Sequence, residues 1–596
     1  MQGPETLTQA LDAAAERTDA GYSHLVQEKE PVKFVAFPEM ARRARRFGAA
    51  LQAAGVRAGE RVGLILPDSS EFIDAIFGAM YAGAIPVPVY PPMNLGQFEG
   101  YLANTTHILR QAGCSLIVTD GKVRPILGKL MNNVPSVRSV EVYSAFVKQV
   151  DERAAPIGVE VKPDDVAFLQ FTSGSTSRPK GVTLTHANLI ANIRALGAGI
   201  RIQREATGVS WLPLYHDMGL IGFVFTPIYY VCTGVTFISP LLFLKRPAVW
   251  LRQLSERKAH ITFAPNFAYG LCTTRIKEHE LQGVDLSHLR VAGCGAEPIQ
   301  FETLRAFADR FAPYGFRREA LLPCYGMAEH SLAVTFVKMS EGMRADNVDP
   351  EALVQGEAKP SEGEGALKVV CCGRAFPGHE LRIVDADGQV LGERKVGQIE
   401  LRGPSIMRGY WGDPERTQEV LKDGWLSTGD LGYLVGDELH VCGRIKDLII
   451  IHGRNYYPQD LEWQASQVEG VRKGNVIAFG LHDTSLGRER VIVAAEARNL
   501  QSGGAAVEEL RDKIAARILE TLALKVDEVV LLPPGSLPKT SSGKLQRHKA
   551  AELYRTGTLG KGVHQAGALD VIKHLAASRW SYIRASFGRR GGDGEE

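Results

Sequence analysis

The fold of this chain is decided by the stretch Thr172-Ser173-Gly174-Ser175-Thr176-Ser177-Arg178-Pro179-Lys180-Gly181. The apolar run Val166 to Phe171 precedes it and predicts a strand, and apolar residues at helical spacing, Leu189 to Leu196, follow it. We therefore expect a strand, a loop and a helix in succession. Small side chains let backbone N–H groups approach phosphate oxygens, and Lys180 adds an ammonium, so a triphosphate is the expected ligand. Pro179 excludes a Walker A loop, which needs glycine directly before the lysine. A polar surface loop is the plain alternative.

Composition indicates a soluble protein with more than one domain. The chain has 596 residues, of which 45% are apolar and 23% charged, and its net charge of +2 gives no indication of a nucleic-acid partner. No window is long and apolar enough to span a bilayer, and the N-terminus lacks a basic region followed by an apolar one. We therefore expect a cytoplasmic protein. The eight cysteines show no metal-ligand spacing, which favours structural thiols in a reducing compartment.

Helices and strands alternate in the first part of the chain. Residues 37–54 place apolar side chains on one face of a helix that ends at Gly55, and residues 61–66 predict a buried strand. Residues 71–82 and 85–89 repeat the pattern. Such alternation predicts mostly parallel sheets covered by helices on both faces.

Further motifs follow the loop. The segment Trp211 to Gly219 contains His216 and Asp217, which by themselves fit a turn capped by aspartate. Residues 220–244 are apolar almost throughout, which is typical of a protein core or of the wall of an apolar pocket. The later motifs are Val291-Ala292-Gly293-Cys294-Gly295-Ala296-Glu297-Pro298, Tyr325-Gly326-Met327-Ala328-Glu329, Trp425-Leu426-Ser427-Thr428-Gly429-Asp430, Gly443-Arg444-Ile445-Lys446-Asp447 and Pro538-Lys539-Thr540-Ser541-Ser542-Gly543-Lys544-Leu545-Gln546-Arg547.

In this order, across roughly residues 30–556, the motifs resemble those of the adenylate-forming (ANL) superfamily. This superfamily holds acyl-CoA synthetases, peptide-synthetase adenylation domains and luciferases. The resemblance implies an α/β fold with a large N-terminal domain, residues 1–443, built from parallel sheets flanked by helices plus a small β subdomain. It also implies a small, mobile α+β C-terminal domain at 444–556, and leaves a tail at 557–596. Most members have glycine where Ser177 follows Thr176, a departure that keeps the phosphate-facing hydroxyls.

The resemblance also implies roles for individual residues. It assigns ATP or AMP binding to Thr172, Ser173, Gly174, Ser175, Thr176, Lys180, Gly295, Ala296, Glu297, Tyr325, Gly326, Met327, Asp430 and Arg444. It assigns the acyl pocket to Trp211, Met218, Gly219 and Ile221. Lys544 is the implied catalytic lysine, whose ammonium bridges the attacking carboxylate and the α-phosphate. His216 lies near that carboxylate, Glu329 holds Mg²⁺, and the C-terminal domain rotates about Asp447.

A polar insertion at about residues 340–367 contains several acidic residues, prolines and glycines. Its composition predicts a mobile segment with one short helix around Pro350 to Val354. A tolerated surface loop is the alternative interpretation. Its position resembles the insertion that distinguishes fatty acyl-AMP ligases from acyl-CoA ligases, so the insertion is also a candidate restraint on domain rotation.

The sequence therefore resembles a fatty acyl-AMP ligase. Such an enzyme uses ATP and Mg²⁺ to convert a medium- or long-chain fatty acid to acyl-adenylate and pyrophosphate. It then passes the acyl group to the phosphopantetheine of an acyl carrier protein. No Gly-x-Asp-Ser-Leu carrier motif occurs in this chain, so the acceptor is expected to be a separate protein. One alternative is an acyl-CoA synthetase, and another is a catalytically silent acyl or nucleotide sensor. Amino-acid adenylation is less favoured, although Asp217 is a possible partner for an α-amine.

Overall fold

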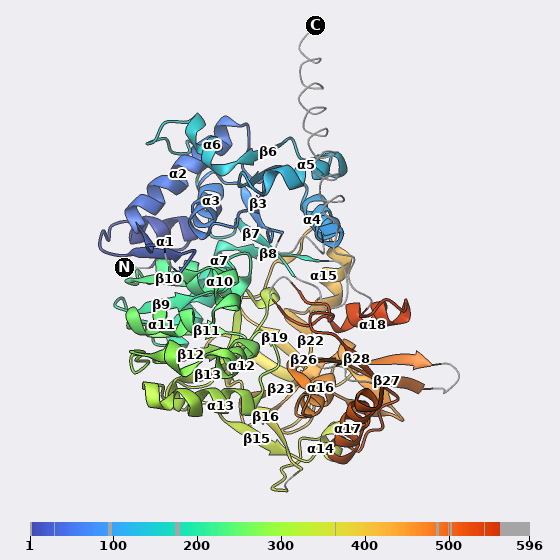
Figure 1. Ribbon diagram of the computed structural model, residues 1–596. Coiled ribbons are helices and arrows are strands. Elements are labelled where there is room, and N and C mark those ends of the chain that lie inside the picture. The colour runs from blue at the N-terminus through green and yellow to red at the C-terminus, as the bar shows by residue number, and fades with distance from the viewer. Residues whose placement is uncertain are drawn as a thin grey trace.

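The N-terminal lobe is built on a four-stranded parallel sheet. The computed structural model describes residues 3–28, 30–92, 98–172, 179–363, 365–483, 488–498, 500, 504–540 and 543–560. The strands of this sheet lie in the order β4 (Ile85–Pro88), β3 (Arg61–Ile65), β5 (Cys114–Thr119) and β6 (Ser139–Val142). Helices α2 (Phe37–Ala53) and α3 (Ser69–Tyr81) lie beside it at the top of Figure 1. Both helices and strands β3 and β4 confirm the predictions for this part of the chain.

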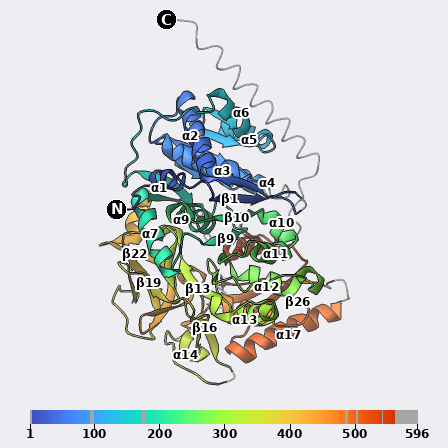
Figure 2. The same cartoon turned by 90° about the vertical axis from the view of Figure 1, so that its left-hand side faces the viewer.

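A nine-stranded sheet forms the centre of the molecule. Its order is β17 (Arg374–Ala375), β14 (Ala333–Phe336), β13 (Leu321–Gly326), β12 (Val291–Cys294), β11 (Ile261–Ala264), β9 (Thr207–Ser210), β10 (Gly234–Ile238), β1 (Gly21–Leu25) and β2 (Lys33–Ala36). The strands from β13 to β1 pair in parallel, whereas the outer strands are antiparallel. The expected parallel sheet is therefore confirmed. Helices near this sheet include α1 (Leu7–Ala14), α7 (His186–Gly199), α10 (Pro240–Lys245), α11 (Ala248–Glu256), α12 (Asn266–Arg275) and α13 (Phe301–Phe311), which Figure 2 shows from the side.

The connection around the glycine- and serine-rich loop differs from the prediction. Strand β7 (Val166–Phe171) is present, but a second strand, β8 (Gly181–Thr185), comes before helix α7. The two strands pair antiparallel, and β20 (Gly409–Tyr410) adds to β8. The prediction of a direct passage from loop to helix was wrong, since residues 181–185, in which Val and Leu alternate with Thr, form a strand. Residues 173–178 lie outside the described part of the chain.

A small antiparallel sheet connects the central sheet to the C-terminal part. It contains β18 (Glu380–Val384), β19 (Gly397–Arg402), β22 (Trp425–Val435), β21 (Leu421–Lys422) and β23 (Glu438–Arg444). Helix α15 (Pro414–Val420) precedes β21. A tight turn after β18 closes at Gly388, whose φ of 80° suits glycine.

The polar insertion is folded, which corrects the prediction of a mobile segment. Strands β15 (Ala345–Val348) and β16 (Leu367–Val370) pair antiparallel, and helix α14 (Pro350–Val354) confirms the short predicted helix. Val348 and Leu353 are buried in a cluster with Tyr433 of β22 and Tyr457. The composition of the insertion did not indicate that it is folded, because only a few apolar side chains anchor an otherwise polar segment.

The C-terminal part forms its own sheets. Strands β26 (Val471–Asp483), β27 (Arg488–Ala497) and β28 (Glu528–Leu532) make one sheet, and β24 (Ile449–Ile451) pairs with β25 (Arg454–Tyr456). Helices α16 (Pro458–Ser466), α17 (Gly504–Leu522) and α18 (Arg547–Arg555) pack with them, at the lower right of Figure 1. This part therefore has the α+β fold that the resemblance implies. Beyond residue 560, the tail lies outside the described residues.

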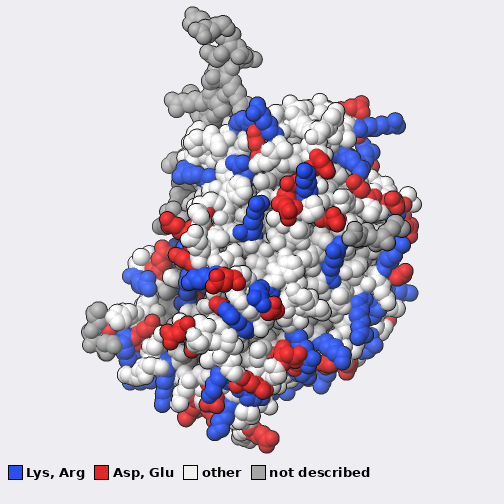
Figure 3. Space-filling view, turned by 180° about the vertical axis from the view of Figure 1, so that it is seen from behind, with Lys and Arg blue, Asp and Glu red and all other residues white. Residues whose placement is uncertain are grey.

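The surface carries mixed charge. On the face in Figure 3, basic and acidic side chains are interspersed, and neither sign gathers into one large patch. All eight cysteines are free thiols, and all but Cys324 are buried. Among the described residues, no helix is both long enough and apolar enough to span a membrane.

Candidate active site

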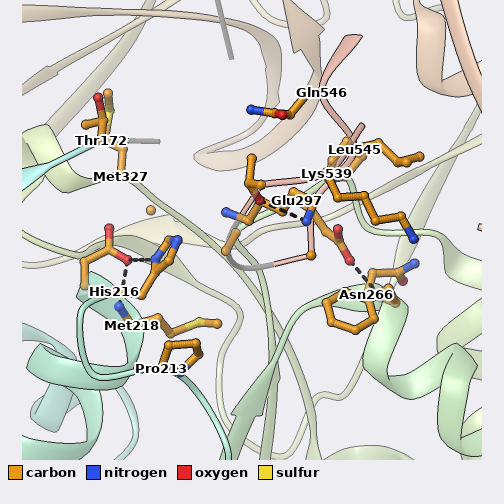
Figure 4. A pocket seen from close by; sticks show the side chains of 18 of the residues that line it. Thr172, Pro213, His216, Met218, Asn266, Glu297, Met327, Lys539, Leu545 and Gln546 are labelled. Atoms are coloured by element: carbon orange, nitrogen blue, oxygen red, sulfur yellow. Dashed lines mark hydrogen bonds and ion pairs between the residues drawn. The ribbon is translucent and has the colours of Figure 1, made fainter. Parts of the chain in front are cut away.

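A cavity of about 4030 Å³ opens between the central sheet and the C-terminal sheet. Its walls come from the ends of β12 and β13, from helix α12, from the segment around His216 and from the loop that carries Lys544. Figure 4 shows His216 and Met218 on one side, with Glu297, Asn266 and Lys539 on the other. The structure thus brings motifs more than 300 residues apart in sequence to one space.

Lys544 enters the cavity from a tight loop of the C-terminal part. Thr540 N–H donates to the Lys544 carbonyl at 2.8 Å, and Lys544 N–H donates to Thr540 Oγ1 at 3.1 Å. Gly543 has a φ of 89°, which this loop requires. Burial lowers the pKa of the Lys544 ammonium, while the carboxylates of Asp217 and Glu297 counteract that shift. Both carboxylates belong to the other wall of the cavity, so they attract the lysine across it.

His216 and Asp217 form a hydrogen-bonded pair at the start of helix α8 (Asp217–Leu220). His216 Nδ1 lies 3.0 Å from Asp217 Oδ1, which also accepts from the Met218 N–H at 2.7 Å. Burial raises the pKa of Asp217, but the hydrogen bond from His216 and its charge outweigh this and leave the pKa below its usual value. Asp217 is therefore ionised and orients the imidazole.

The residues expected to line the acyl pocket separate into two groups. The Trp211 ring stacks on Phe243 with centroids 4.0 Å apart, and both Trp211 and Met218 line the cavity. Ile221 is fully buried and does not line it, and neither does Gly219. Instead, Gly222 and Phe223 of the π-helical turn η3 (Ile221–Phe225) contribute to the wall.

Gly219 has a packing role that leads to a prediction. A Cβ atom there would lie 2.3 Å from the Pro213 carbonyl oxygen, whereas one at Gly222 would lie 3.7 Å from Leu332. Gly219→Ala therefore displaces the segment that carries His216. Because the resemblance implies a place for His216 near the reacting carboxylate, we expect adenylate formation to fall by about 10²-fold. Gly222→Ala is the matched control and should keep the activity. The measure is pyrophosphate release, and equal activity of the two variants would contradict the prediction.

Asp430 connects strand β22 to two other motifs. Its Oδ2 accepts from the Tyr325 hydroxyl at 2.7 Å, and its Oδ1 accepts from Arg444 Nε at 2.9 Å. The Asp430 N–H donates to Thr428 Oγ1 at 3.0 Å, which fixes the turn. Tyr325, Gly326, Met327 and Asp430 all line the cavity. The carboxylate is thereby placed between an aromatic ring and a guanidinium.

The residues after β12 form another part of the wall. A Cβ at Gly295 would lie 2.7 Å from Cys324 Sγ, so the chain passes close to β13 there. Ala296 has a φ of 68°, which turns the backbone into the cavity. Glu297 Oε1 accepts from the Phe267 N–H at 2.6 Å and holds the start of α12. Burial raises the pKa of Glu297, and the ammonium groups of Lys544 and Lys539 oppose that rise.

Lys180 and Glu329 meet through Tyr410. Lys180 Nζ lies 4.8 Å from the Tyr410 ring centroid, and the Tyr410 hydroxyl donates to Glu329 Oε1 at 2.9 Å. Thr172 N–H donates to the Lys180 carbonyl at 3.0 Å, which joins the two residues that flank the glycine- and serine-rich loop. Burial raises the pKa of Glu329, and the Tyr410 hydroxyl and the Lys180 charge limit that shift. The expected phosphate ligands Ser173, Gly174, Ser175 and Thr176 lie outside the described residues.

Sequence reasoning missed some residues of this site. Tyr410 belongs to a two-residue strand, and no local pattern marks it. Lys539 and Arg547 stand in the quoted C-terminal motif, but only Lys544 was assigned. Their position within three to five residues of Lys544 was the signal that could have found them.

Comparisons with known proteins agree with this geometry. A family model described as AMP-binding enzyme matches residues 11–411, and one described as Disco-interacting protein 2-like, AMP domain matches residues 446–562. A candidate acyl-CoA synthetase of Caulobacter vibrioides is 36% identical over 561 residues, which are 93% of this chain and 96% of the relative. The medium-chain-fatty-acid–acyl-carrier-protein ligase JamA of Moorena producens is 34% identical, covering 90% and 93%. A solved structure from studies of fatty acyl-adenylate ligases of E. coli and L. pneumophila has a TM-score of 0.86 and 37% identity, covering 93% and 98%.

Proposed function

The chain belongs to the AMP-binding enzymes, and within them to the fatty acyl-AMP ligases, and from this membership we propose that it acylates a separate acyl carrier protein. As a member it is an ATP-dependent, AMP-forming acid–thiol ligase. The proposed substrate is a medium- or long-chain fatty acid. Its acceptor is the phosphopantetheine thiol of the carrier.

The proposed chemistry has two half-reactions. In the first, the fatty acid carboxylate attacks the α-phosphorus of ATP, a new O–P bond forms, and the bond to pyrophosphate breaks. Lys544 stabilises the negative charge that the transition state gathers on the α-phosphate and the carboxylate. The His216–Asp217 pair lies on the opposite side of the cavity and orients the carboxylate. In the second, the thiol attacks the acyl carbon and AMP leaves.

The nucleotide fits the remaining groups. Asp430 offers its carboxylate oxygens to the ribose hydroxyls, next to Tyr325 and Arg444. Lys180 and Thr172 lie at the neck of the loop proposed to hold the phosphates. Glu329 keeps an oxygen that is not bonded to Tyr410, and one carboxylate with substrate phosphates suits Mg²⁺. Bound there, the ion would neutralise phosphate charge as pyrophosphate leaves.

The observation that carries the choice of acceptor is the packing of the insertion. Leu353 and Val348 lie in one buried cluster with Tyr433, on the N-terminal side, and Tyr457, on the C-terminal side. Val354 and Leu367 of the insertion also pack against the C-terminal core around Ile449 and Leu461. We propose that this contact restrains rotation about Asp447 and disfavours CoA. JamA, which is named a medium-chain-fatty-acid–acyl-carrier-protein ligase, supports this choice.

The second candidate is an acyl-CoA synthetase, which the relative from Caulobacter favours. A paired assay separates the two functions. Protein with ATP, Mg²⁺ and dodecanoate is incubated alone, with CoA, or with a phosphopantetheinylated carrier protein. We expect acyl-adenylate to accumulate alone and with CoA, and to be consumed by the carrier. Conversion to acyl-CoA would establish the synthetase instead.

The restraint by the insertion gives a further prediction. Leu353→Ala combined with Val354→Ala removes apolar contacts with both parts of the protein. We expect acyl-CoA formation to rise about 10-fold or more above the wild-type rate, while adenylate formation is kept. The control is Glu351→Ala, which changes an exposed residue of the same helix. If acyl-CoA formation does not rise above the wild-type rate, the restraint fails, and the shape of the pocket must explain the specificity.

A further inference from the structure

Arg547 joins two carboxylates from different parts of the chain. Its Nε and Nη2 donate to the two oxygens of Glu462, each at 2.7 Å, and its Nη1 donates to Asp447 Oδ2 at 2.9 Å. The side chains are 21%, 14% and 8% exposed for Arg547, Glu462 and Asp447. Arg547 begins helix α18 and stands three residues after Lys544. The guanidinium thus lies at the base of the loop that places Lys544.

The two partners of Arg547 have different positions in the fold. Glu462 lies on α16, and its Oε1 also accepts from the Ala478 N–H of β26 at 3.1 Å, so it is fixed within the C-terminal sheet. Asp447 ends the short turn η8 (Ile445–Asp447), which joins β23 of the small sheet to β24. A rotation of the C-terminal part about this connection carries Glu462 and Arg547 together. The same rotation moves the Asp447 side chain relative to both.

We propose that the Arg547–Asp447 ion pair is a latch that keeps Lys544 inside the cavity, which makes Arg547 a positioning residue for adenylate formation. The proposal rests on the proposed function, since it takes rotation about Asp447 as the step between the two half-reactions. The latch opens when the C-terminal part turns, and Glu462 then holds Arg547 ready to close it again. Arg547 thus stays paired with Glu462 during the rotation, whereas its contact with Asp447 breaks and forms again.

The chemistry of the residue supports this role. A guanidinium has five donors in a planar fork, so it can bind Glu462 through two of them and still reach Asp447. A lysine ammonium is a single point charge that cannot repeat this arrangement. Arg547→Lys should therefore retain the pair with Glu462 and weaken the contact with Asp447. A role in fold stability alone would predict no difference between the two half-reactions.

The matched control is Arg488, the first residue of β27, which forms another two-point ion pair in the C-terminal part. Its Nη1 and Nη2 donate to the two oxygens of Asp527 at 2.8 and 2.7 Å, with the Arg488 side chain 23% exposed. It does not line the cavity. Arg488→Lys therefore disturbs a comparable pair that includes neither Asp447 nor Glu462.

The test combines kinetics with a distance between the two parts. Spin labels are attached through Arg257→Cys at the end of α11 and Asp512→Cys on α17, both exposed positions. The native cysteines are buried except for the half-buried Cys324, which limits background labelling. The distance between the labels is measured in the wild type, Arg547→Lys and Arg488→Lys. Acyl-adenylate formation and acyl transfer from supplied acyl-adenylate are measured separately.

We expect Arg547→Lys to broaden the distribution of distances between the two labels. It should also lower kcat for acyl-adenylate formation about 10-fold, because the Arg547–Asp447 contact no longer holds Lys544 in the cavity. Transfer from supplied acyl-adenylate should not fall. Arg488→Lys should leave both rates within about twofold of the wild type. An unchanged distance distribution, or an equal loss in both half-reactions, would overturn the latch. If the wild type acylates no carrier protein, the proposed function fails, whereas the distance and adenylation results still decide the latch.

A second variant guards against misfolding of the first. Asp447→Asn removes the charge at the connection and leaves the pair of Arg547 with Glu462 in place. It should cause the same shift in distance and the same loss of adenylation. Combined with Arg547→Lys it should cause no further loss, because both changes break one contact. Additive losses would overturn the proposal.

Discussion

Lys544→Ala is expected to lower the rate of acyl-adenylate formation by about 10²–10³-fold, the usual cost of removing one group that stabilises transition-state charge. The ammonium reaches the cavity between Asp217 and Glu297, where burial makes an uncompensated phosphate charge costly. Because we propose that this lysine acts in the first half-reaction only, acyl transfer from supplied acyl-adenylate should be preserved. The measurement is ATP–pyrophosphate exchange, alongside transfer to a carrier protein.

The control for this prediction is Lys513→Ala. Lys513 lies on α17, pairs with Glu509 and is outside the cavity. Lys513→Ala should leave the rate of ATP–pyrophosphate exchange unchanged. A Lys544→Ala variant that retains exchange would show that another group carries the charge, and Lys539, which enters from the same loop, would be examined next.

Asp430→Ala is expected to lower kcat/KM for ATP by about 10²-fold or more, since each hydrogen bond to a charged group contributes about 1.5–3 kcal/mol. The substitution removes the proposed acceptor of the ribose hydroxyls. It also leaves the Tyr325 hydroxyl and Arg444 Nε without the partner that now orients them. The loss should fall mainly on nucleotide binding, and the KM for the fatty acid should change little.

A substrate analogue tests the proposed contact directly. The wild type should prefer ATP to 2′-deoxy-ATP, and Asp430→Ala should lose that preference. Asp437→Ala, in the exposed turn between β22 and β23, is the control and should keep it. A variant that still discriminates between the two nucleotides would place the ribose elsewhere.

Local pattern was sufficient for the elements that surround the site. The apolar face of residues 37–53 and the glycine at 55 define helix α2, because each signal depends on neighbours a few residues apart. The motifs at 295–297 and 325–329 lie at the ends of β12 and β13. The comparisons support the family that those motifs indicated.

Other features depend on contacts between distant segments. The pairing of β8 with β7 and β20, and the burial of Leu353 against Tyr433 and Tyr457, involve residues far apart in the chain. Tyr410 reaches Glu329 from a strand too short to predict.

The sequence alone determined the helices and strands of residues 37–89, the family and the motifs that indicate the chemistry, since these depend on residue type and short spacing. Only the tertiary structure decided which side chains share one space. Asp430 lies 105 residues from Tyr325, and Arg547 lies 100 residues from Asp447. Contacts over such separations arise when packed sheets bring segments together, and no local pattern records them.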